Sequence, residues 1–497
     1  MTAAATTTTT SKGRLRMGFV SIGSTLGSTV TGLILSLITG RLIGAPELGK
    51  YVLAAAPALV ATSLSSIGEQ RLVLRVTGDH GSRLAFWSVL TTSFRVTARV
   101  VTVATIGSAV VFIVLLDKPT LFPLSVVLLL AFLLIDNTIA SLDGVLLSAN
   151  RSGTVGGLRA LSPVIHAALV LLAVPILGRT YWNLVVAQVI GNGAIAIFKA
   201  WQMKSTIWPF VPKRDRSQAT EDIRRVQNTL IASNAGASLV KSFPPFIVSL
   251  GYRSVGGSAV EKAVSDASVA AFSRSDTVAR QMSTVAAFFE LSNFSSVVDR
   301  KHAESDLFIK SFKMIEAFAG AILMLGSAAG LFLTYVMPIY GKTFEVDSVR
   351  FMSFLGLHYA LEAVGVGVLS ASWATYPVDR LSRVLALGCI PAFLAAAAWW
   401  FFRFEAAIGA TAVMSALTVS HMAIGLVAGI RKVPPHARRW AKGCVFRLFL
   451  RVFVCLSLLS WCAFFGTRFQ GALVGALLFG LSVGQVLPAM KSLRNSR

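Results

Sequence analysis

Long apolar blocks alternate with short polar or basic stretches along almost the whole chain. The blocks run to roughly 18 to 25 residues, which is enough for a helix to cross a hydrocarbon core of about 30 Å. Unpaired backbone groups are costly in lipid, so each block is predicted to be a helix. The pattern predicts about fourteen transmembrane helices, at residues 17–39, 49–68, 97–116, 121–147, 157–177, 183–203, 229–250, 267–298, 311–337, 350–373, 384–402, 406–430, 448–465 and 471–490.

Composition agrees with an all-α polytopic membrane protein. Of the 497 residues, 55% are hydrophobic and 14% are charged, which excludes an ordinary soluble globule. The formal net charge of +24 would suggest nucleic acid as a partner of a soluble protein. Here most Lys and Arg residues lie between apolar blocks, where they set membrane topology, so no nucleic-acid partner is predicted.

The distribution of basic residues predicts the orientation of the chain. Counted from a cytoplasmic N-terminus, the inside segments hold about 32 Lys and Arg and the outside loops about 10. Both termini are therefore predicted to be cytoplasmic, with the densest basic loops at 199–225 and 431–447. The stretch 83–99 carries Arg95 and Arg99 and is predicted to be a short interfacial helix leading into the third span.

The central basic stretch suggests a division of the chain into two lobes. We expect a disordered cytoplasmic tail at 1–16, an N-terminal lobe of six helices at 17–203, a basic cytoplasmic linker at 204–228, a C-terminal lobe of helices seven to twelve at 229–430, and two additional helices with the C-terminus at 431–497. This is a six-plus-six repeat with two extra helices. No loop has room for a folded soluble domain. The four cysteines form no C-x-x-C pair, and neither a metal site nor a cofactor is predicted.

Three short motifs resemble those of a known family. Residues 40–51 read GRLIGAPELGKY, 142–151 read LDGVLLSANR and 270–276 read AAFSRSD. In order and position they resemble motifs of Wzx-like polysaccharide flippases, a branch of the multidrug/oligosaccharidyl-lipid/polysaccharide (MOP) exporter superfamily. Phe272 departs from the tyrosine that is frequent in that family. The resemblance implies a two-lobed, V-shaped bundle that moves a polyprenyl-linked saccharide from the cytoplasmic to the outer leaflet.

Basic residues inside predicted spans are candidates for substrate binding, because a charge at the bilayer centre costs at least ~2.5–3.5 kcal/mol. Lys241 precedes two prolines that must interrupt the seventh helix, and it either binds an anionic substrate there or snorkels from a simple kink. Arg280 is four residues after Asp276, a spacing that predicts an ion pair. Arg274 has no such local partner and is the better candidate for a cation facing a cavity. Arg41, at the outer end of the first span, either caps its helix, meets headgroups or touches substrate.

Acidic residues in the spans could couple transport to an ion gradient. Asp136 shares a helix face with Asp143, and Glu362 lies one turn beyond His358, which could relay a proton. The alternative, which we favour, is that Asp136 and Glu362 neutralise Lys241 and Arg274 across the lobe interface. Two solitary histidines are instead expected to bond backbone carbonyls of neighbouring helices, namely His166 and His421.

Three functions remain open from the sequence. The first is a flippase of the bacterial inner membrane that uses alternating access and a cationic central cavity, with a polyprenyl-linked saccharide and membrane lipids as partners and polysaccharide polymerase and glycosyltransferases as further ones. The second is a cation-coupled multidrug antiporter of the MATE type, which would want an acidic cavity. The third is a membrane enzyme such as a polysaccharide polymerase or acyltransferase. Short outer loops disfavour the third, so no enzymatic activity is predicted.

Overall fold

The computed structural model describes residues 31–65, 69–149, 151–224, 240, 242–252, 259–280, 304–376 and 378–495, and most of these residues lie in helices. Seven helices in these ranges are long and apolar enough to cross a membrane, or eight if the bent pair Thr31–Ile43 and Ala45–Thr62 counts as one span. The all-α polytopic fold is thereby confirmed. The number fourteen stays a prediction.

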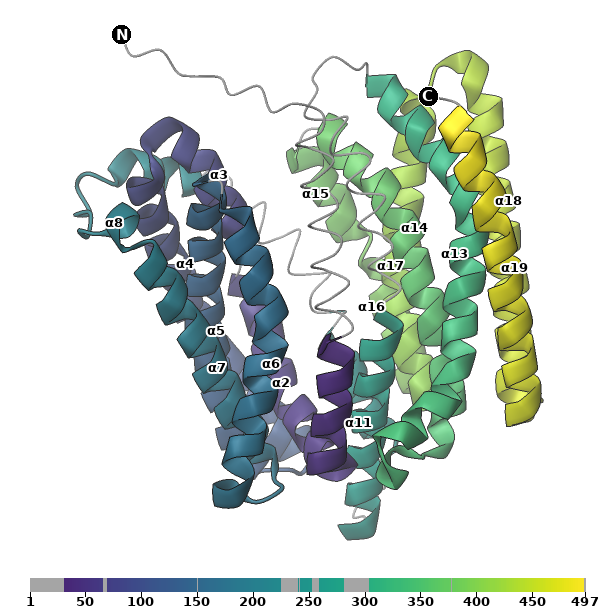
Figure 1. Ribbon diagram of the computed structural model, residues 1–497, viewed down its shortest axis with the longest axis horizontal. Coiled ribbons are helices and arrows are strands. Elements are labelled where there is room, and N and C mark those ends of the chain that lie inside the picture. The colour runs from purple at the N-terminus through teal and green to yellow at the C-terminus, as the bar shows by residue number, and fades with distance from the viewer. Residues whose placement is uncertain are drawn as a thin grey trace.

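The helices form two groups that lie side by side (Figure 1). The first group holds the helix Thr31–Ile43, α2 (Ala45–Ser65), α3 (Glu69–His80), α4 (Ser82–Ala109) with its π-helical extension η1 (Val110–Leu115), α5 (Leu121–Ser148), α6 (Ser152–Leu177), α7 (Tyr181–Gln202) and α8 (Lys204–Ile207). The second holds α10 (Pro244–Gly251), α11 (Ala259–Ala279), α13 (Glu304–Tyr340), the 3-10 turns η3 (Lys342–Phe344) and η4 (Asp347–Ser353), α14 (Phe354–Thr375), α15 (Val378–Leu387), α16 (Ile390–Phe402), α17 (Ala406–Lys432), α18 (Pro435–Phe464) and α19 (Arg468–Asn495).

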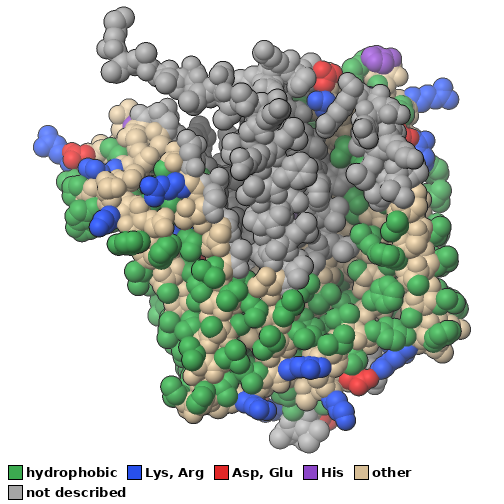
Figure 2. Space-filling view, in the orientation of Figure 1, with side chains coloured by type: hydrophobic (Ala, Val, Ile, Leu, Met, Phe, Trp, Pro, Cys, Tyr) green, Lys and Arg blue, Asp and Glu red, His purple; other side chains and the backbone are tan. Residues whose placement is uncertain are grey.

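Where the visible face is coloured by residue type, apolar side chains cover most of the region between its two ends, and charged side chains gather toward those ends (Figure 2). Many large hydrophobic residues are exposed on the outer helices, among them Leu172, Phe401, Phe446 and Phe469. Lipid tails are as apolar as these side chains, so the faces need no protein partner. The distribution is that of a multi-pass membrane protein.

The two groups meet at one end through a shared core. The largest buried cluster joins Leu53 and Phe132 of the first group to Val269, Tyr340 and other residues of the second. In Figure 1 the groups lie apart at the opposite end, which carries α3, α8 and the end of α19. We call the end where they meet the closed end.

The stretch 83–99, predicted as an interfacial helix that leads into the third span, is continuous with that span. Ser82–Leu115 forms one continuous helical run of 34 residues. The physical reason is that no Pro or Gly interrupts the sequence between Ser82 and Gly107. The linker that follows α7 covers part of the side of α4 that was expected to face lipid headgroups. Trp87 donates to the carbonyl of Ile207 at 2.7 Å, and Arg216 donates to the carbonyl of Trp87 at 2.8 Å.

The central stretch predicted as a basic loop is also partly built into the first group. Lys199, placed in that loop by the sequence, lies in α7 and is buried. Ile207, Ala219 and Ile223 of the linker belong to a buried cluster with Val89 of α4. The apolar side chains at these positions explain the packing, because contact with α4 removes their surface from water. Residues 204–224 therefore pack on α4 as part of the first group.

The glycines of the 40–51 motif each have a structural reason. Gly44 has φ +86°, a left-handed conformation that suits glycine, and it separates two helices bent by 114°. A Cβ on Gly40 would lie 2.9 Å from the Tyr340 ring. A Cβ on Gly49 would lie 1.9 Å from the backbone oxygen of Asp266. The motif therefore builds a tight helical hairpin whose backbone touches the second group.

We expect Gly49→Ala to weaken the closed end, because the added methyl group must push α2 away from the backbone of α11. The cost should be about 1–3 kcal/mol, as for other overpacked sites. Thermal unfolding of the purified protein measures it. Gly193→Ala, where nothing lies within 4 Å of the added Cβ, is the matched control. Equal melting temperatures for the two variants would contradict the close approach.

Candidate functional site

A polar pocket between the two groups surrounds Arg274. Its volume is about 210 Å³, and its walls come from the helix Thr31–Ile43, α2, α6, α7 and α11. Polar groups face it from each of these elements. They are Ser36, Thr39, Tyr51, His166, Gln188 and Arg274. Thus the structure places Arg274, a residue predicted to face a cavity, in one.

The guanidinium of Arg274 has little compensation for its charge. One nitrogen donates to the Ser36 hydroxyl at 2.7 Å, and Ser36 in turn lies 3.4 Å from the Tyr340 hydroxyl. The Nε atom is buried and has no hydrogen-bond partner among the described residues. Within those same residues no carboxylate forms an ion pair with Arg274. A buried cation with donors to spare is suited to hold an anion.

A second polar cluster borders the pocket within the first group. Asn192 of α7 donates to Asp136 of α5 at 3.1 Å. His166 of α6 packs on Gly191, where a Cβ would lie 2.5 Å from the imidazole ring. Tyr51 interacts electrostatically with both Asp136 and Arg274, which links this cluster to the cation.

The two solitary histidines have different surroundings. His421 bonds the carbonyl of Leu385 at 3.0 Å, as predicted. The prediction for His166 is wrong, since its Nδ1 lies 3.4 Å from the Ser162 hydroxyl and its Nε2 is buried without a partner in the described part of the chain. Because the pocket lies beside it, the imidazole faces space that a ligand could occupy.

Arg280 forms the predicted ion pair with Asp276, at 2.6 Å. The Tyr359 hydroxyl joins this pair, because it donates to Asp276 at 2.5 Å and accepts from Arg280 at 3.2 Å. Its ring also lies 5.8 Å from the guanidinium. Arg280 is thus held by a carboxylate, whereas Arg274, six residues earlier, is not.

The other predicted ion-coupling residues lie in the second group. His358 of α14 is buried, 3.5 Å from the Ser415 hydroxyl, with its ring 4.7 Å from that of Tyr359. Glu362, one turn further along α14, is half-buried and interacts with other groups. Asp136 bonds Asn192 within the first group, so the described contacts do not pair it with Arg274.

Two predicted substrate-binding residues lie elsewhere. Arg41 is exposed, and its Nε donates to the carbonyl of Ile339 at 2.6 Å, which makes it a link between the groups at the closed end. This contact fits neither a cap of its own helix nor a pocket position. Lys241 lies outside the described residues, as does Glu290.

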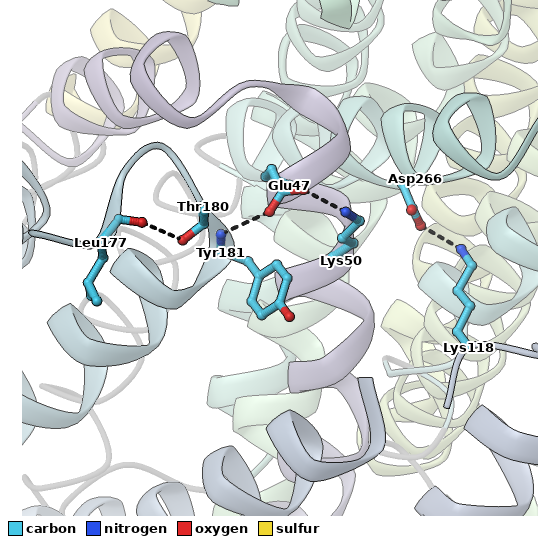
Figure 3. Close-up of polar contacts among 7 residues, drawn as sticks. All are labelled: Glu47, Lys50, Lys118, Leu177, Thr180, Tyr181 and Asp266. Atoms are coloured by element: carbon cyan, nitrogen blue, oxygen red, sulfur yellow. Dashed lines mark hydrogen bonds and ion pairs between the residues drawn. The ribbon is translucent and has the colours of Figure 1, made fainter. Parts of the chain in front are cut away.

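Charged residues that the sequence did not single out hold the closed end together (Figure 3). Lys118, in the turn before α5, lies 2.5 Å from Asp266 of α11, and both side chains are nearly buried. On α2, Glu47 pairs with Lys50 at 2.5 Å and accepts from the Tyr181 backbone at 3.1 Å. The available signal was a basic residue in a predicted outside loop, Lys118, and a carboxylate directly before the eighth predicted span, Asp266.

A buried ion pair inside the first group also escapes prediction from the sequence. Lys199 of α7 lies 2.5 Å from Asp143 of α5, with side-chain exposures of 2% and 5%. The sequence pattern puts Lys199 where the sixth predicted span, 183–203, and the basic loop, 199–225, overlap, and it relates Asp143 only to Asp136 on its own helix. In the part of the chain that is described, no group of three His, Cys, Asp or Glu residues could hold a metal ion.

Comparison with known proteins gives solved structures only, since no family model and no curated protein matches. An inward-facing multidrug resistance transporter of the MATE family, in the MOP superfamily, is 16% identical with a TM-score of 0.48, covering 87% of this chain and 99% of that one. A eukaryotic MATE transporter is 12% identical with a TM-score of 0.49, covering 87% and 97%. A MOP superfamily transporter from Pyrococcus furiosus is 14% identical with a TM-score of 0.47, covering 88% and 96%. At these values the likeness assigns neither a family nor a substrate to this chain.

Proposed function

We propose that this protein is a MOP-type transporter that flips a polyprenyl-linked oligosaccharide across the bacterial inner membrane for surface polysaccharide synthesis. The observation that carries the proposal is the buried Arg274 guanidinium, which lies in a pocket between the two helix groups without a carboxylate partner among the described residues. A diphosphate or a sugar carboxylate would supply the missing negative charge. A saccharide would bond the neighbouring hydroxyl, amide and imidazole groups.

The arrangement of the groups supports alternating access. Polar contacts and a backbone contact join them at the closed end, and the motif that resembles flippases forms part of this junction. With both termini cytoplasmic, as the basic residues predict, the closed end faces outward. This would be the state that loads substrate from the cytoplasmic side, where glycosyltransferases finish it. A polymerase on the outer side would receive the product.

The multidrug antiporter is the second candidate, and Asp136 is the observation in its favour. This carboxylate is half-buried in the first group and interacts electrostatically with Tyr51 at the pocket. A cationic drug would need that charge as its counter-ion. Arg274 in the same pocket repels such a substrate, which is why we place the flippase first.

The proposal is tested in two steps. In a deletion strain, surface polysaccharide should disappear while lipid-linked saccharide accumulates, and the wild-type gene should restore both. In vesicles, the purified protein should make a labelled lipid-linked saccharide on the inner leaflet accessible to an external lectin. Altered susceptibility to cationic drugs with intact polysaccharide would favour the antiporter. Chemical turnover of the saccharide by the purified protein would favour the enzyme.

A further inference from the structure

A large apolar cavity also lies between the two helix groups. Its volume is about 730 Å³. The first group contributes α2, α4 and η1, and the second contributes α10 and α16. Valine, leucine and aromatic side chains dominate the walls, including Val103, Phe243, Phe246 and Trp400. Several of these are partly exposed, so the cavity is open at its surface. We call it the apolar groove.

One cation lies on the wall of the apolar groove. Among the described residues that line it, Arg99 is the only charged one. Arg99 is exposed and takes part in no hydrogen bond or ion pair within the described chain. Arg95 lies one helical turn before it and is also exposed. Two arginines one turn apart, with no carboxylate partner among the described residues, favour a phosphate at this position.

The lining of α4 is arranged for a long chain. Arg99, Val103, Gly107 and Val111 line the groove at four-residue intervals, a row that turns slowly around the helix as it ascends. From Arg99 to Leu115 the lining residues extend about 24 Å along the helix axis at 1.5 Å per residue. Nothing lies within 4 Å of a Cβ built on Gly107, so the groove stays open at its middle. A ligand with a phosphate at one end and a hydrocarbon chain behind it matches this layout.

We propose that the apolar groove binds a polyprenyl phosphate, with the phosphate at Arg99 and the isoprenoid chain along α4 toward the closed end. This inference rests on the proposed function, since it assigns the tail and the phosphate of the same cargo to the apolar groove and leaves a carboxylate of the saccharide as the anion at Arg274. In a membrane, burial of hydrocarbon alone selects nothing, because lipid tails are equally apolar. Selection comes from the phosphate at Arg99 and from a chain long enough to fill the groove past the aromatic residues of α10 and α16.

The test uses photoreactive lipids with the full-length protein in vesicles. A photoreactive polyprenyl monophosphate without sugar should label peptides of α4 and α10, and unlabelled polyprenyl phosphate should compete. Arg99→Gln removes the cation and should lower labelling at least about tenfold, as the loss of one charge-assisted contact would. Gly107→Leu fills the groove and should lower labelling by excluding the chain. Gly193→Leu is the matched control, since that glycine also has open space around it but does not line the groove.

The outcomes separate this inference from the function. Equal or stronger labelling of the groove by a photoreactive phosphatidylglycerol, without competition by polyprenyl phosphate, would identify an ordinary lipid site and overturn the inference, while flipping by the wild-type protein would still stand. Groove labelling that both variants abolish, in a protein that flips no saccharide, would keep the site and remove the function. Arg99→Gln adds no atoms to the groove, so its effect on labelling tests the inference even if the Gly107→Leu protein does not fold.

Discussion

Arg274→Ala should abolish transport while the protein still reaches the membrane. The variant removes the cation of the polar pocket and the donor to Ser36. Each charge-assisted hydrogen bond to substrate is worth about 1.5–3 kcal/mol, so the loss of two would lower affinity by about a hundredfold or more. Surface polysaccharide in a complemented deletion strain, with a membrane blot for protein level, measures the effect.

Stability should respond to Arg274→Ala in the opposite sense from an ordinary buried residue. The wild-type guanidinium leaves its Nε buried and unsatisfied in the described structure, so its removal relieves a cost instead of adding one. We expect an unchanged or raised melting temperature. Arg179→Ala is the control, an exposed arginine near the closed end that lines neither the polar pocket nor the apolar groove. Wild-type polysaccharide from Arg274→Ala would remove the proposed site.

Lys199→Ala should destabilise the protein strongly. It leaves the buried Asp143 carboxylate without its ion-pair partner, a loss of about 3–5 kcal/mol in comparable buried pairs. The protein should unfold at a much lower temperature in detergent or fail to accumulate. The double variant Lys199→Met with Asp143→Leu should recover most of the loss, because both charges then leave the interior together.

A second ion pair provides the comparison for Lys199→Ala. Lys262 lies 3.3 Å from Asp117, and their side-chain exposures are 48% and 61%. Exposed pairs contribute about 0–1 kcal/mol, so Lys262→Ala should leave the melting temperature nearly unchanged. If both alanine variants melt alike, burial of the Lys199 pair is not what stabilises the first group.

The sequence predicts those features that depend on local pattern. Apolar blocks of sufficient length specify membrane helices, and the four-residue spacing of Asp276 and Arg280 specifies their ion pair. Arg274 could be singled out because no acid occurs at the spacings that would pair it on its own helix. These inferences use neighbours along the chain and need no knowledge of how the helices pack.

Features that depend on packing between helices could not be predicted. Lys199 resembles any residue of a basic loop until α5 brings Asp143 beside it. The sequence favours a backbone carbonyl as the partner of His166, but the glycine opposite it lets the ring lie against α7 at the pocket. Arg83 and its neighbours suggest an interfacial helix when they are considered alone. The linker that covers α4 lies more than a hundred residues later in the chain, so the local pattern could not reveal it.

The attachment of the linker to α4 determines which parts of the chain travel together. Arg216 donates to the Trp87 carbonyl at 2.8 Å, and the fully buried Ile223 belongs to the hydrophobic cluster against α4. Residues 204–224 would therefore move with the first group as cargo crosses, although the sequence pattern separates them from that lobe as a linker. A spin label on the exposed Ser217 would report the motion of that group's rigid body.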